Sequence, residues 1–227
     1  MLITIDGPAG SGKSTVAKIL ASRLGFRYLD TGAMYRCVAL SALRAGIALD
    51  DDEAAGRLAE SIEIEFSVLS PDVASSGAML SQQVLLDGED VTGQIRTTAV
   101  DDAVLQVSKL PSVRTAMLVK QRAFGDAGDL VAEGRDTGTA VFPGARLKIF
   151  LTASASERAK RRHAEFTGRG EHVSSAVVSE SMNARDEADA TRQASPLTIA
   201  PDAHVIDTTG VSIDEVVDRI VALAQAR

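Results

Sequence analysis

The sequence predicts an α/β fold in which a mostly parallel sheet is covered by helices on both faces. Three observations support this prediction. Short apolar strands alternate with helical patterns along most of the 227 residues, and a glycine-rich loop joins the first strand to the first helix. One middle segment instead shows the two-residue period of an antiparallel hairpin. A chain of this length is enough for one core with a small inserted part.

The expected strands of the main sheet are short and apolar, as buried parallel strands are. They fall at 2–5, 28–29, 130–132, 147–151 and 205–207. Helices are expected between these strands, where apolar residues recur at helical spacing. They run from the glycine loop to Gly25 and over about 33–44, 97–109, 111–124, 154–166, 174–189 and beyond 212. Ser-x-x-Glu sequences that begin at Ser154 and Ser212 are helix-capping signals.

The middle of the chain departs from this alternation. Over 62–68, apolar and acidic residues alternate, which predicts a strand with one side in water. A turn signal at 75–77 and a second strand over 82–86, ending at Asp87-Gly88, complete a hairpin pattern. We therefore expect residues 62–95 to form an inserted lobe, with the core made by 1–61 and 96–227.

Composition limits the classes of protein that the chain can belong to. The net charge of -7 argues against a general nucleic-acid or acidic-membrane surface. One cysteine, Cys37, allows neither a disulfide within the chain nor a cysteine zinc site. No stretch approaches the roughly 20 apolar residues of a membrane span, and the first residues do not resemble a signal peptide. We expect a cytoplasmic monomer without nucleic-acid or membrane partners.

Residues 7–14 carry the strongest motif of the chain. They read GPAGSGKS and match G-x-x-x-x-G-K-[ST] at every fixed position. Glycines let successive backbone N–H groups converge on phosphate oxygens, and the following helix directs its positive end at the same anion. Lys13 is expected to reach the β- and γ-phosphates of ATP, and the Ser14 hydroxyl to ligate Mg²⁺. The alternative, a chance match on a structural loop, is disfavoured by the apolar strand before it and the amphipathic helix after it.

Phosphate-binding loops occur in switches, motors and kinases. A GTPase switch needs an N-K-x-D motif, but the only asparagine, Asn183, is followed by Ala184. A kinase of a small molecule needs a second anion site, and arginines suit one because their planar fork binds two oxygens. The candidates are Arg36, Arg114, Arg135, Arg158, Arg161, Arg162, Arg185 and Arg192. Any one of them, taken alone, could equally be a solvated surface charge.

Four segments together resemble the bacterial cytidylate kinases, a family of nucleoside monophosphate kinases. They are 7–15, 30–36 (DTGAMYR), 134–139 (GRDTGT) and 185–192 (RDEADATR), and 88–97 resembles the insert of that family. The resemblance implies a P-loop kinase fold with a five-stranded parallel sheet, a monophosphate-binding lobe and a short lid over about 158–172. It also implies transfer of the γ-phosphate of ATP to CMP or dCMP with Mg²⁺, a step of pyrimidine nucleotide metabolism.

The resemblance assigns the residues of the donor side. The loop that binds ATP would comprise Gly7, Pro8, Ala9, Gly10, Ser11, Gly12, Lys13, Ser14 and Thr15. Three arginines in or beside the lid would close over the ATP phosphates, namely Arg158, Arg161 and Arg162. With Lys13 and Arg135, they are the residues expected to act on the transferring group.

The resemblance also assigns the acceptor side. Thr31, Arg114 and Asp136 would read the cytosine. Arg36, Arg135 and Arg192 would hold the acceptor phosphate, with Tyr35 beside it. Arg185 and Asp189 would reach the sugar. Thr31 stands where the family often has serine, so the hydroxyl is kept. Leu105 stands where some relatives have a serine that helps to hold the sugar, which leaves the choice between ribose and deoxyribose open.

The chemistry of cytosine supports the role of Asp136. Cytosine carries an exocyclic amino donor that a carboxylate accepts, whereas uracil carries an acceptor at that position. A site built on such a bond can reject the wrong base strongly. A structural or magnesium-linked carboxylate is the alternative for Asp136. For the whole chain, the alternatives are a kinase of UMP, AMP or a metabolite such as shikimate, and a regulator that binds ATP to change partners.

Overall fold

The computed structural model describes residues 1–68, 70–71, 80–168, 170, 173–192 and 194–226. Within them, a five-stranded sheet of order β10-β9-β1-β8-β2 forms the centre, and every pairing in it is parallel. Its strands are β1 (Leu2–Asp6), β2 (Arg27–Asp30), β8 (Leu130–Gly134), β9 (Leu147–Thr152) and β10 (His204–Asp207). The predicted parallel sheet is confirmed, with each strand one or two residues longer than expected.

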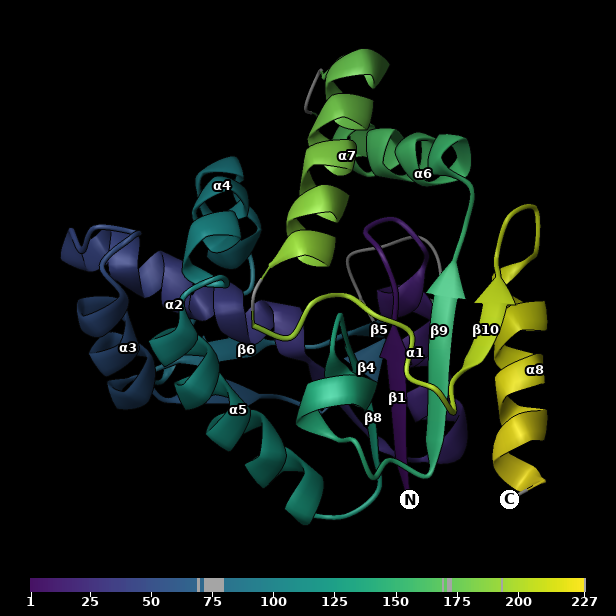
Figure 1. The fold of residues 1–227 in the computed structure, drawn as a ribbon. Coiled ribbons are helices and arrows are strands. Elements are labelled where there is room, and N and C mark those ends of the chain that lie inside the picture. Colours follow the sequence, from purple (N-terminus) through teal and green to yellow (C-terminus); the bar gives the residue numbers. More distant parts are fainter. Residues whose placement is uncertain (69, 72–79, 169, 171–172, 193, 227) are drawn as a thin grey trace.

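Helices cover both faces of this sheet (Figure 1). One core packs α1 (Lys13–Leu24) and α8 (Ile213–Gln225) against it. The other core packs α2 (Thr31–Ala45), α3 (Asp52–Ser61), α4 (Thr98–Val107) and α5 (Pro111–Asp126) against the opposite face. Strand β8 serves both cores, because Val131 belongs to the first and Leu130 and Ala132 to the second. Burial of β8 on both faces explains the apolar run from Leu130 to Ala132.

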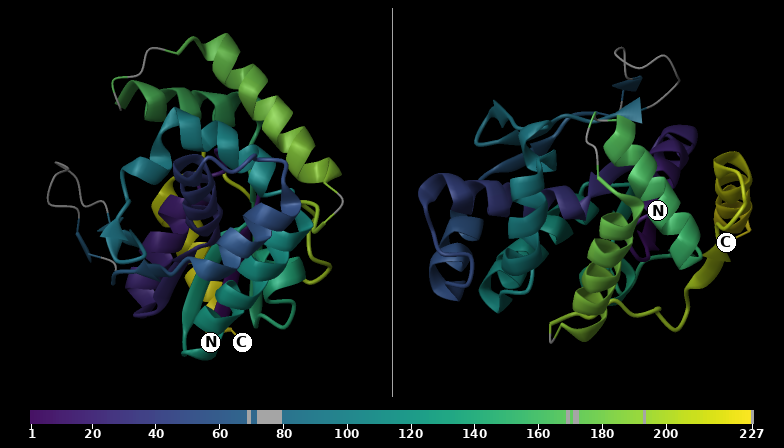
Figure 2. Two further views of the ribbon diagram at one scale, coloured as in Figure 1. Left: turned by 90° about the vertical axis from the view of Figure 1, so that its left-hand side faces the viewer. Right: turned by 90° about the horizontal axis from the view of Figure 1, so that it is seen from above.

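The antiparallel insert is also confirmed. Strands β3 (Ile64–Phe66), β6 (Val84–Leu86) and β7 (Glu89–Asp90) form a small sheet, and β4 (Ser70–Pro71) pairs with β5 (Leu80–Ser81). Asp87 and Gly88 have φ angles of 51° and 82°, as a tight hairpin turn requires. The first strand begins later than expected because the Ile62 N–H still donates to Leu58 at the end of α3. The expected turn at 75–77 lies outside the described residues. Figure 2 shows the insert projecting from one side of the core.

Helix α3 was not predicted from the sequence. Asp51 caps it by accepting from the Ala54 N–H at 3.0 Å, and two acidic residues occupy its first turn. A Cβ at Gly56 would lie 2.5 Å from the Ser112 Cβ, so glycine lets α3 and α5 approach closely. Asp52 in turn accepts from the Ser112 N–H at 2.9 Å, which ties the start of α5 to α3.

Two further helices, α6 (Ala155–Gly168) and α7 (Ser175–Thr191), lie beyond the C-terminal ends of the strands (Figure 1). The Glu157 N–H donates to Ser154 at the start of α6, and Ser212 and Glu215 form the predicted capping box of α8. Short helical turns complete the fold at η1 (Gln94–Arg96) and η2 (Thr137–Val141). Among the described helices, none combines the length and apolar character that crossing a membrane requires.

Candidate active site

The loop between β1 and α1 has the backbone that the motif predicts. Gly7, Gly10 and Gly12 have φ angles of 149°, 73° and 89°. A Cβ at Gly7 would lie 2.0 Å from the Leu151 carbonyl oxygen, so glycine is required there. Gly12 begins α1 without a side-chain cap, which leaves the first N–H groups of the helix directed at the loop. This backbone geometry suits the binding of a phosphate.

Lys13 and Glu133 are buried beside this loop and interact electrostatically. The Lys13 Nζ donates to the Pro8 carbonyl at 2.7 Å, so the ammonium lies over the loop. Burial lowers the pKa of Lys13 to about 7, and the charge of Arg135 adds to this while Glu133 opposes it. Burial raises the pKa of Glu133, and Asp30 adds to that rise. A bound polyphosphate would favour the charged lysine and restore its pKa.

The oxygen atoms around Ser14 fit a magnesium ion held jointly with phosphates. The Glu133 carboxylate accepts from the Tyr28 hydroxyl, and the Ser14 hydroxyl is near enough to lower the pKa of Glu133. The described residues contain no cluster of three or more His, Cys, Asp or Glu that could hold a metal. Mg²⁺ commonly uses one or two protein oxygens and completes its shell with water and substrate phosphates. A hydroxyl and one carboxylate are therefore sufficient.

Sequence reasoning gave Glu133 no role. Its place follows from the register of the sheet, in which β8 pairs with β1 and Gly134 lies opposite Asp6. The sequence feature that could have indicated this role is a carboxylate near the C-terminal end of a predicted strand. The strand order that makes β8 the neighbour of β1 is not readable from the sequence.

Asp6 fixes the phosphate loop relative to the segment that follows β8. Its carboxylate accepts from the Thr137 N–H at 2.9 Å, the Thr137 hydroxyl at 2.7 Å and the Gly138 N–H at 2.7 Å. Burial raises the pKa of Asp6, although these hydrogen bonds oppose the rise. Arg135 and Asp136 are consequently held beside the loop.

The three residues predicted to read the base, Thr31, Arg114 and Asp136, lie at the end of β8. Asp136 pairs through one oxygen with Arg114 and through the other with Arg192, whose Nη2 lies 3.1 Å away. The Arg114 guanidinium lies 5.4 Å from the centre of the Tyr35 ring. The Thr31 hydroxyl donates to the Glu133 carbonyl at 2.7 Å. The group is buried, and it also includes Tyr35 and Arg192, which were assigned to the acceptor phosphate.

A second group gathers three arginines from three elements. Arg135 donates through Nε to Asp189 at 2.8 Å, and Arg36 pairs with Asp101 and donates to the Ile95 carbonyl at 2.9 Å. Arg185 is buried near both of these arginines. Its burial and then the charges of Arg135 and Arg36 lower its pKa to about 10.

The second group has the character of an anion site. Within the described residues, Arg185 makes no hydrogen bond or ion pair. Burial would raise the pKa of Asp189, but Arg135 holds it below its ordinary value. Three guanidinium groups that repel one another are stabilised by a bound anion, and the fork geometry suits a phosphate.

The three lid arginines separate into two groups. Arg158 donates to the Ala9 carbonyl of the phosphate loop at 3.2 Å and pairs with Asp186 of α7. Arg161 donates to the Thr208 carbonyl at 2.7 Å, and a Cβ at Gly12 would lie 3.7 Å from its Nη1. Arg162 instead pairs with Asp101 on the other side of the site. Only the first two lie at the phosphate loop.

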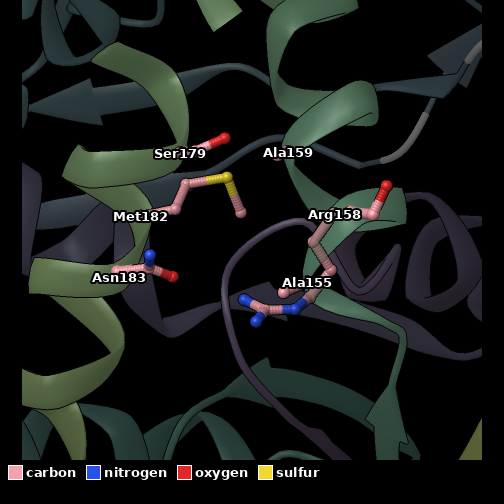
Figure 3. Close-up of a pocket in the computed structure, with 7 residues that line it drawn as sticks. Ala155, Arg158, Ala159, Ser179, Met182 and Asn183 are labelled. Atoms are coloured by element: carbon pink, nitrogen blue, oxygen red, sulfur yellow. The ribbon is translucent and has the colours of Figure 1, made fainter. Parts of the chain in front are cut away.

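A small cavity separates α6 from α7 (Figure 3). Arg158 and Met182 face it from the two helices, and a Cβ at Gly10 would lie 3.0 Å from the Met182 methyl. Its volume of about 130 Å³ is below the roughly 300 Å³ of the smallest usual ligand pockets. The cavity is therefore a packing gap. Beside it, α6 and α7 contact the phosphate loop through Arg158 and Met182.

The fold is that of a P-loop kinase, and the glycine loop and the arginine cluster are its two candidate anion sites. The chain belongs to the cytidylate kinase family, whose model matches residues 3–226. The cytidylate kinase of Pseudomonas fluorescens (strain Pf0-1) is 48% identical over 221 residues, which cover 97% of this chain and 93% of that protein. That of Pseudomonas entomophila (strain L48) is 48% identical over 219 residues, with 96% and 93% covered.

Two solved structures share the fold at low identity. An uncharacterized protein from Eubacterium ventriosum ATCC 27560 has a TM-score of 0.54 at 13% identity, covering 100% of this chain and 99% of that one. A gluconokinase from Sinorhizobium meliloti 1021 has a TM-score of 0.50 at 16% identity, covering 99% and 91%. At this identity they support the P-loop kinase fold alone.

Proposed function

We propose that the protein transfers the γ-phosphate of ATP to CMP or dCMP and releases ADP with CDP or dCDP. The observation that carries this proposal is that a buried cluster of Arg36, Arg135 and Arg185 accompanies the glycine loop at 7–14, with Arg135 and Arg185 near enough to Lys13 to lower its pKa. The loop and the cluster would be the donor and acceptor phosphate sites. Between them lies a carboxylate, Asp136, held by two arginines. Membership of the cytidylate kinase family supports the choice of acceptor.

Asp136 and Thr31 would select cytosine over uracil. The Thr31 hydroxyl proton is engaged by the Glu133 carbonyl, so its oxygen is left to accept. Asp136 also presents acceptors. The amino group of cytosine can donate to both, whereas the carbonyl of uracil would face unsatisfied acceptors. Arg192 contacts Asp136 through Nη2 and lies 3.7 Å from Asp189 through Nη1, so it would border both the base and the acceptor phosphate.

The acceptor phosphate would bind to Arg36, Arg135 and Arg185. Asp189 orients Arg135 through the bond to its Nε and leaves the outer edge of the guanidinium for the phosphate. The nucleophile is a phosphate oxygen that is ionised at neutral pH, so the reaction needs no strong general base. Catalysis would come from alignment of the two phosphates and from neutralising charge on the transferring group.

On the donor side, the loop N–H groups, Lys13 and Arg158 would hold the ATP phosphates. Ser14 and Glu133 would hold Mg²⁺, which when bound supplies charge neutralisation across the phosphates. Helices α6 and α7 lie over the strand ends and would exclude water, which otherwise consumes ATP by hydrolysis.

The remaining assignments complete the proposal. Residues 62–95 would be the inserted part of the monophosphate-binding lobe, and 158–172 the lid, of which 169 and 171–172 lie outside the described residues. We expect a cytoplasmic monomer of pyrimidine nucleotide metabolism, with small-molecule substrates and no nucleic-acid or membrane partner.

A coupled assay of ADP release tests the function. The purified protein is given ATP, Mg²⁺ and, in separate reactions, CMP, dCMP, UMP, AMP or shikimate. The proposal predicts ADP release that depends on CMP or dCMP. Equal or faster release with another acceptor would reassign the substrate, and ATP binding without release for any acceptor would favour a regulator. The rates with CMP and dCMP also measure the sugar preference that Leu105 leaves open.

A further inference from the structure

Asp101 joins two arginines that come from opposite sides of the site. It lies in the first turn of α4, and its Oδ1 accepts from Arg36 of α2. Its Oδ2 lies 3.3 Å from Nη2 of Arg162 on α6. The side chains of Asp101 and Arg36 are each 15% exposed, and that of Arg162 is 20% exposed. The bridge is therefore mostly removed from water, where an ion pair is screened less than at the surface.

Both arginines are also held on other atoms. Arg36 donates through Nη1 to the Ile95 carbonyl at 2.9 Å. Arg162 lies 2.8 Å from Glu165 through Nη1, and its guanidinium lies 4.7 Å from the centre of the Phe166 ring. Because a guanidinium carries five N–H donors, each arginine keeps donors for a phosphate while Asp101 fixes its orientation. Asp101 thus resembles the outer partners that orient ligating side chains.

The adjacent residue, Asp102, does not share the contacts of Asp101 with the two arginines. Asp102 lies on the same turn of α4 but is exposed, and it forms no hydrogen bond or ion pair with the described residues. Asp101 is also close enough to Arg185 to raise its pKa, against the lowering by burial and by Arg135. The carboxylate consequently lies at the point where α6 meets the arginine cluster.

We propose that Asp101 is a positioning residue that aligns Arg162 of α6 with Arg36 at the acceptor phosphate. By bridging them, it brings the lid arginine to the transferring phosphoryl group and couples placement of α6 to the acceptor side. This inference rests on the proposed function, because it takes Arg36 as a phosphate ligand and Arg162 as a lid arginine. The family resemblance gave Asp101 no role.

The test is a double-mutant cycle in the full-length protein with ATP, Mg²⁺ and CMP. The variants are Asp101→Asn, Arg162→Met and the two together, with Asp102→Asn as the matched control. We expect Asp101→Asn to lower kcat about tenfold, the value for a lost hydrogen bond between charged groups, while the KM for ATP changes little. Asp102→Asn should stay within about twofold of the wild type. In the Arg162→Met background, Asp101→Asn should add little further loss.

Two further measurements separate positioning from folding. The thermal midpoint of Asp101→Asn should stay near that of Asp102→Asn. Asp101→Glu, which keeps the carboxylate, should recover part of the lost kcat. Independent, multiplicative losses from Asp101→Asn and Arg162→Met would overturn the inference. So would an Asp101→Asn variant that equals the control, or one with a lower KM for CMP and a higher kcat, since the carboxylate would then compete with the phosphate.

The same assay distinguishes the failure of this inference from that of the proposed function. A wild-type protein that does not phosphorylate CMP overturns both. A wild-type protein that is active with CMP, but whose kcat is indifferent to Asp101→Asn, overturns the inference alone.

Discussion

The donor and acceptor sides of the site are built in different ways. The donor side is one continuous loop, 7–14, whose backbone N–H groups and glycine φ angles create the phosphate site. The acceptor side is a set of side chains from α2, α5, α7 and the end of β8, with arginines paired to Asp101, Asp136 and Asp189. A continuous backbone site is local and is readable from the sequence. A site of paired side chains depends on the tertiary fold, so its partners become visible only in the structure.

The largest effect is expected on the donor side. Lys13→Ala removes the charge that lies over the loop, where Nζ donates to the Pro8 carbonyl, and should lower kcat by at least about 10²–10³-fold. The thermal midpoint should change much less than the activity. The control is Lys109→Ala, at an exposed position after α4. Near wild-type turnover of Lys13→Ala would refute the role of the loop as the donor site.

The next effect concerns base selection on the acceptor side. Asp136→Asn replaces an acceptor that faces the base with an amide that can also donate, so the preference for CMP over UMP should fall about 10–100-fold. The measurement is the ratio of kcat/KM for the two nucleotides. Asp126→Asn, an exposed substitution at the end of α5, should leave the ratio unchanged. If Asp136→Asn keeps the wild-type ratio, Asp136 is a structural carboxylate.

A smaller effect is expected for Thr31. Thr31→Val keeps the shape of the side chain but removes the oxygen that would accept from cytosine, so the CMP preference should fall by about three- to tenfold. Thr31→Ser, which keeps the hydroxyl, should remain close to the wild type. Equal selectivity in the valine and serine variants would leave base reading to Asp136 and its arginines.

The smallest expected effect is the uptake of a proton by Lys13 when ATP binds. The ligand-free pKa of Lys13 is about 7, so at pH 8 the lysine is mostly neutral and must gain a proton when polyphosphate binds. Calorimetric titration of ATP in buffers of different ionisation enthalpy should show uptake of up to about one proton at pH 8. The uptake should shrink toward pH 6, where the lysine is already charged. Lys13→Met provides the subtraction, and equal uptake in this variant would assign the proton to another group.

The same contrast explains what could be predicted from the sequence. The five parallel strands and the hairpin were predicted because apolar runs and two-residue alternation are local patterns. Helix α3 was missed because its apolar positions are mostly alanine and it contains Gly56. The loop at 7–14 was recognised because it matches its motif at every fixed position, and its glycines have the positive φ angles that the motif predicts.

The contacts of the acceptor side were harder to predict. The resemblance supplied the residues that gather there, but not which of them touch. Glu133 and Asp101 were overlooked because their partners, Ser14 and Arg162, are distant in the sequence. Arg192 was assigned with Arg36 and Arg135 to the acceptor phosphate, and Arg162 with Arg158 and Arg161 to the ATP phosphates. The structure pairs Arg192 with Asp136 and Arg162 with Asp101. Helix packing decides such pairings, and no local pattern records it.

The proposed function requires two phosphate sites, the loop at 7–14 and the arginine cluster, with the Asp136 carboxylate reading cytosine between them. Competition in one reaction tests this claim most directly. The protein receives ATP, Mg²⁺ and equal concentrations of CMP and UMP, and the products are followed by ³¹P NMR. The account predicts that CDP and ADP appear in equal amounts and that UDP follows only after CMP is consumed. Equal initial rates of CDP and UDP formation, or release of orthophosphate without either diphosphate, would contradict it.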